Sequence, residues 1–119
     1  MSDFEKQFAG VVQSVSNATR GVFNAIDKML FQALISNLKS EDFQAASIAI
    51  DQLAKEKKPI AIPPLFFVSK SHPNARVRVK AEEALKVFGE DQKIAKLTEG
   101  KEVQEAVKLL IGEFGNYKQ

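Results

Sequence analysis

The 119-residue chain contains no cysteine, no tryptophan and a single histidine. Without cysteine, the protein can form no disulfide, no thiolate metal site and no thiol nucleophile. A single histidine excludes a metal centre built from several imidazoles. No apolar run approaches the ~20 residues that a transmembrane helix needs, so the sequence predicts no membrane span.

The first residues also carry no targeting pattern. The run Met1-Ser2-Asp3-Phe4-Glu5 lacks the basic start and the apolar core of a secretory signal. The amphipathic stretch that begins there has few lysines on its polar face, which is unlike helices that bind anionic lipid. We therefore expect a cytoplasmic protein that does not bind membranes.

The positive charge is concentrated in one segment. The whole chain has 17 basic and 15 acidic side chains, a net charge of +2. Residues 55–80, here called the basic segment, hold Glu56 as their one acid and seven cations, which gives +6. Such a segment can attract phosphate or an acidic protein surface. An ordinary solvated face of lysines explains the same pattern.

Apolar residues recur at helical spacing almost throughout the chain, and no window alternates with the period of a strand. We predict helices over about 3–19, 22–39, 40–58, 75–88, 90–98 and 103–115, with a break at Gly21 and with Ser40 as an N-cap. A further short helix starts at Ile62-Pro63-Pro64, because proline is tolerated in a first turn. Its nearly all-apolar sequence predicts burial on most sides. The fold class is therefore all-α.

The chain repeats itself at an offset of 32 residues. Residues 30–39 then fall on 62–71, and the turn 40–42 falls on the turn 72–74. Ala49 falls on Ala81, and Leu53 falls on Leu85. Each unit is a helix, a turn and a second helix. Because one helix pair cannot bury its own apolar face, neighbouring units are expected to stack.

The segment 64–85 resembles a HEAT-type helical repeat. The turn Pro73-Asn74 is followed by Val77-Arg78, and then by small and apolar residues along the second helix, Ala81, Ala84 and Leu85. This resemblance implies a short right-handed α-solenoid of six or seven helices in one domain, residues 1–119. It would comprise a capping helix (about 3–19), units at about 22–58 and 60–89, and a degenerate unit at about 90–115.

No constellation of catalytic or metal-binding residues stands out. His72 precedes Pro73 in a predicted turn, and no serine and acid nearby complete a triad. Glu82 and Glu83 are adjacent on a helix and point about 100° apart, so they do not face each other. The glycines form no phosphate-binding loop. We therefore assign no catalytic, cofactor or metal site, and we expect a protein that is not an enzyme.

Proteins built from such repeats usually bind other macromolecules. We expect a non-catalytic adaptor or accessory protein that binds another protein through the second helices of its units. Self-association through an end face of so short a solenoid is a further expectation. The residues expected on the rim of that surface are Lys55, Lys58, Arg76 and Lys80. The alternative is a nucleic-acid-binding module that uses the basic segment. Against it, no aromatic residue is interleaved with the charges for base stacking.

Overall fold

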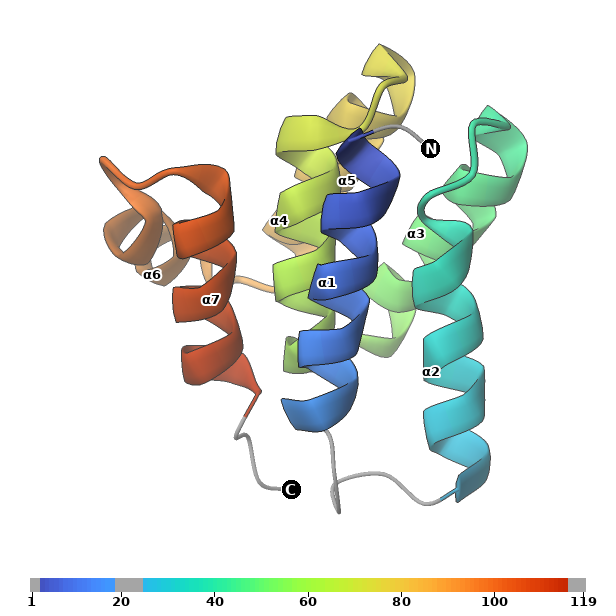
Figure 1. Cartoon of the computed structure of the whole chain (residues 1–119), viewed down its shortest axis with the longest axis horizontal. Helices are drawn as coiled ribbons and strands as arrows, with labels where there is room; N and C mark the ends of the chain where they lie inside the picture. The colour runs from blue at the N-terminus through green and yellow to red at the C-terminus, as the bar shows by residue number, and fades with distance from the viewer. Residues whose placement is uncertain (1–2, 19–24, 116–119) are drawn as a thin grey trace.

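In the residues that it describes, the computed structural model of the chain consists of helices and short turns (Figure 1), as the helical spacing of the apolar residues predicts. The structure describes residues 3–18 and 25–115. Within these residues it contains no strand, so the all-α prediction is confirmed. The elements are α1 (Asp3–Ala18), α2 (Ala25–Asn37), α3 (Phe43–Glu56), the 3₁₀ helix η1 (Pro59–Ala61), α4 (Ile62–Ser71), α5 (Ala75–Val87), α6 (Asp91–Thr98) and α7 (Val103–Phe114).

The observed helix bounds follow the predictions closely, with two differences. The N-cap of α3 is Asp42 and not Ser40, because the Asp42 carboxylate accepts the Gln44 backbone N–H at 3.0 Å. The 3₁₀ helix η1 precedes α4 and was not predicted. The expected break at Gly21 lies outside the described residues.

Helix α4 occupies the centre of the described fold. Pro63 and Pro64 stand in its first turn, where the missing N–H groups cost no hydrogen bond. All residues from Ile62 to Val68 are buried, which confirms the predicted burial. Helices α1, α5 and α7 pack around α4, and Figure 1 shows α1 in front of it.

Contacts between aromatic rings pack α1 against α4. The Phe4 and Phe8 rings lie 5.6 and 6.0 Å from the Phe67 ring, measured between centroids. Both phenylalanines are buried. Helix α1 also contacts α2 and α7, so it lies against elements of all three predicted repeat units.

Consecutive helices pair as α2 with α3, α4 with α5, and α6 with α7. Between pairs, α3 lies beside α5, whereas α7 packs mainly on α4. The principal extents are 34, 33 and 27 Å. The described helices therefore form a compact all-α globule and not an elongated rod.

Candidate partner-binding site

Two side-chain contacts join α3 to α5 along a line that we call the α3–α5 seam. The guanidinium carbon of Arg76 lies 4.0 Å from the centroid of the Phe43 ring. The Lys80 ammonium lies 2.9 Å from the Asp51 carboxylate. On each helix, the residue of the Phe43–Arg76 contact comes before the residue of the Asp51–Lys80 contact. The two helices therefore run in the same direction, and the seam follows their length.

The structure places the four predicted rim residues in a line rather than a cluster. Arg76 and Lys80 belong to the seam. Lys55 is exposed near the C-terminal end of α3, one turn beyond Asp51. Since it stands 12 residues after Phe43, it is about 18 Å from the Arg76 contact along the helix axis. Lys58 follows α3, and its ammonium lies 3.9 Å from the Glu56 carboxylate.

Most cations of the basic segment have contacts inside the fold. The Lys70 ammonium lies 5.7 Å from the Phe66 ring centroid, and the Arg78 guanidinium donates to the His72 carbonyl oxygen. Lys58, Arg76 and Lys80 have the contacts described above. Among the side chains that the structure describes, Lys55 and Lys57 are the cations of the basic segment with neither an acidic partner within 4.0 Å nor another such side-chain contact. The +6 charge is thus divided among separate local contacts.

Two apolar side chains lie exposed beside the seam. Ile48 on α3 is 69% exposed, and Val79 on α5 is 57% exposed. Ile48 precedes Asp51 by three residues, and Val79 directly precedes Lys80. Neither residue was predicted as part of the site, although both lie apart from the buried apolar residues of their helices. That position was the signal that could have identified them.

His72 is fully buried between two turns. The Asn74 backbone N–H donates to its Nδ1 at 3.0 Å, so Nε2 carries the proton and donates to the Ser40 carbonyl oxygen at 3.0 Å. Burial lowers the pKa of His72, and the Arg78 charge lowers it further, while the bond to Ser40 opposes both. Because both ring nitrogens are engaged, this imidazole is not available to a substrate as a general base.

The two turns that His72 joins have the same hydrogen bonds at the offset of 32 residues. Asp42 accepts the Gln44 N–H at 3.0 Å, and Asn74 accepts the Arg76 N–H at 2.9 Å. The side chain two residues before each cap accepts the N–H of that cap: Ser40 Oγ at 3.1 Å and His72 Nδ1 at 3.0 Å. The turns that begin α3 and α5 are therefore equivalent.

The described residues contain neither a cluster of metal-ligating side chains nor a membrane-spanning helix. No three histidine, aspartate or glutamate side chains among them come together as metal ligands. None of the helices in the described ranges is both long and apolar enough to cross a bilayer. No family model, no curated protein and no solved structure matches this chain.

Proposed function

We propose that this protein is a non-catalytic adaptor that binds another protein through the outer side of α3 and α5. We call this surface the α3–α5 face, defined as Ile48, Asp51, Lys55, Arg76, Val79 and Lys80. The observation that carries the proposal is the exposure of Ile48 and Val79 on two adjacent helices, next to charged side chains already fixed by the seam.

The chemistry of this face suits a protein partner. Protein interfaces combine apolar side chains at their core with a polar rim, and arginine is enriched in them. Arg76 lies against the Phe43 ring, so ordering it on binding costs less side-chain entropy than for an unsupported arginine. Asp51 is paired with Lys80 but remains 66% exposed, which leaves it accessible to a donor from a partner.

The proposal includes the short right-handed α-solenoid. Three observations support it: α3 and α5 lie side by side, they run in the same direction, and their turns have equivalent hydrogen bonds 32 residues apart. The resemblance of residues 64–85 to a HEAT-type repeat adds to these. Stacked second helices of such units present a continuous surface to a partner.

The alternative is a nucleic-acid-binding module that uses the basic segment. The exposed Lys55 and Lys57 favour it, because they can meet phosphates. The internal contacts of Lys58, Lys80 and Arg76 count against it, because the first two charges are partly neutralised and the third lies over an aromatic ring. We therefore place it second.

Capture from a lysate of the native host, with and without nuclease, separates the two functions. The tagged chain is compared with an Ile48→Ser/Val79→Ser variant and with a matched control, Leu109→Ser, which alters an exposed leucine on α7. We expect a stoichiometric protein that survives nuclease, persists in the control and is lost in the double variant. Recovery of nucleic acid alone, removed by nuclease, would replace the adaptor by the alternative.

A further inference from the structure

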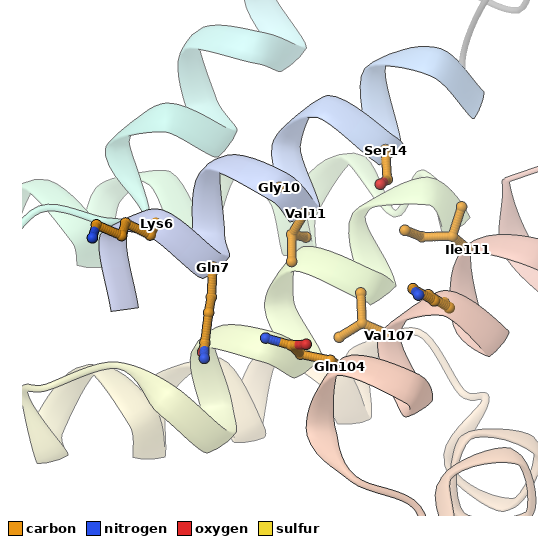
Figure 2. A pocket seen from close by; sticks show the side chains of 9 residues that line it. Lys6, Gln7, Gly10, Val11, Ser14, Gln104, Val107 and Ile111 are labelled. Carbon is orange, nitrogen blue, oxygen red and sulfur yellow. The ribbon is translucent and has the colours of Figure 1, made fainter. Parts of the chain in front are cut away.

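A groove runs between α1 and α7, on elements that the α3–α5 face does not use. Its volume is about 380 Å³. Figure 2 shows Val11 and Val107 lining its middle, with Lys6 toward one end and Ser14 and Ile111 toward the other. The lining residues are Lys6, Gln7, Gly10, Val11 and Ser14 of α1, and Gln104, Val107, Lys108 and Ile111 of α7.

The charges on this groove are all of one sign. Lys6 and Lys108 belong to the lining, which contains no aspartate or glutamate. Neither lysine has an acidic partner within 4.0 Å among residues 3–18 and 25–115. The amides of Gln7 and Gln104 add neutral hydrogen-bond donors. An apolar floor of valine and isoleucine with unopposed ammonium groups is complementary to an amphiphilic anion.

Gly10 shapes the α1 wall of this groove. It lies inside α1, where glycine is less favourable to a helix than alanine. A Cβ atom at this position would meet nothing within 4 Å, so no packing contact in the described fold requires a glycine here. Its absent side chain leaves the wall of the groove low, which allows close approach of a ligand to the helix.

The size of the groove indicates a small ligand rather than a protein segment. Its α1 wall extends from Lys6 to Ser14, a rise of eight residue steps or about 12 Å along the helix. Protein interfaces use roughly 20–30 residues on each side, more than the nine that line this groove. Small-molecule sites measure roughly 300–1,000 Å³, a range that includes it.

We propose that the α1–α7 groove binds a free medium-chain carboxylate. The carboxylate lies at the Lys6 end of the groove and its chain lies on Val11, Val107 and Ile111, while the Lys108 ammonium adds longer-range attraction to the anion. Binding is reversible and involves no covalent step. This inference does not rest on the adaptor function, and its test uses a different surface.

Titration calorimetry with decanoate, whose extended chain is about as long as the groove, tests the proposal. Decanol serves as the neutral ligand of the same length. We expect saturable decanoate binding, at least tenfold tighter than decanol binding. A Lys6→Gln/Lys108→Gln variant should lose about tenfold in decanoate affinity, because each exposed charge contact contributes modestly, and should bind decanol as the wild type does.

A matched pair of glycine variants localises the ligand. Gly10→Leu fills the groove, whereas Gly112→Leu makes the same change in α7, also in open space but outside the lining. Both should raise Tm by about 4 °C, because leucine favours a helix over glycine. Only Gly10→Leu should abolish decanoate binding, and its raised Tm shows that the loss is not a failure to fold.

Three results would overturn the proposal. They are absence of saturable decanoate binding at millimolar concentration, equal affinity for decanoate and decanol, and unchanged binding by Gly10→Leu. Co-sedimentation with vesicles containing an anionic phospholipid forms a separate arm. If the protein binds such vesicles through this groove but does not bind decanoate, the ligand is a lipid headgroup surface and not a free carboxylate.

Discussion

At the residue scale, His72 links two turns that are distant in sequence. Its protonated Nε2 donates to Ser40 in the first turn, and its Nδ1 accepts from Asn74 in the second. A second proton would have to occupy Nδ1, where the Asn74 N–H already points. The fold therefore favours neutral imidazole, in agreement with the lowering of the His72 pKa by burial.

This linkage predicts a loss of stability in mild acid. The pKa of His72 lies below its ordinary value of 6.5 in the folded protein. Below about pH 6.5 the unfolded chain binds a proton that the folded chain does not, so the free energy of unfolding falls as the pH falls toward the folded pKa. Above about pH 6.5 this contribution is fully present. Urea unfolding at about pH 7.5 and about pH 5.5 measures the difference.

A His72→Gln variant provides the control for this effect. It should lower the free energy of unfolding at neutral pH by about 1–3 kcal/mol, because buried polar groups in the two turns lose partners. It should also reduce the dependence of stability on pH. If wild type and variant show the same pH dependence, His72 is not its source.

The Phe43–Arg76 contact makes a prediction of its own. A guanidinium at 4.0 Å from the ring centroid at a partly exposed site contributes about 0.5–1 kcal/mol. A double-mutant cycle with Phe43→Leu and Arg76→Gln, followed by urea unfolding, should give a coupling energy of that size. Additive effects of the two substitutions would mean that the ring does not hold the arginine.

At the element scale, the sequence predicted most helices because their signals are local. The apolar spacing of α1 and the prolines that begin α4 are patterns of residues only a few positions apart in the chain. The N-cap of α3 was missed for a different reason. Ser40 and Asp42 are both favourable cap residues, and the local sequence does not choose between them. The fold chooses Asp42, while the Ser40 carbonyl accepts from His72, 32 residues away.

Because the N-caps of α3 and α5 are equivalent, removing either one should lower the stability of the protein by a similar amount. Asp42→Ala and Asn74→Ala each remove a side-chain acceptor of 2.9–3.0 Å from a helix N-terminus. Each should lower the free energy of unfolding by about 1 kcal/mol. Glu41→Ala, a neighbouring exposed acid that caps no helix, should change it by less than about 0.5 kcal/mol. Thermal unfolding of the three variants checks this, and a cost confined to one cap would contradict the equivalence of the two turns.

At the scale of the whole molecule, packing concentrates on α4. Leu65 is fully buried in this helix. Leu65→Ala should therefore lower the free energy of unfolding by about 2–5 kcal/mol through the cavity that it leaves. Val79→Ala, at a position 57% exposed, should cost less than about 0.5 kcal/mol. Similar costs at the two sites, measured by urea unfolding, would contradict the central position of α4.

The candidate site was harder to predict than the helices, because it depends on how helices from different parts of the chain pack together. The sequence placed Arg76 and Lys80 on the rim of the predicted surface, and their spacing of four residues puts them on one face of a helix. It did not reveal that they meet Phe43 and Asp51, since that depends on how α3 and α5 lie against each other. Nor did it reveal that Ile48 and Val79 lie beside this seam, exposed on adjacent helices.

Site-specific photocrosslinking in the native host tests the central claim, that the α3–α5 face binds another protein. A photoreactive phenylalanine analogue replaces Val79, and in a control chain it replaces Leu109 on α7. Irradiation should join position 79 to one defined protein, whereas position 109 should give no such product. A defined product from position 109 with none from position 79 would contradict it.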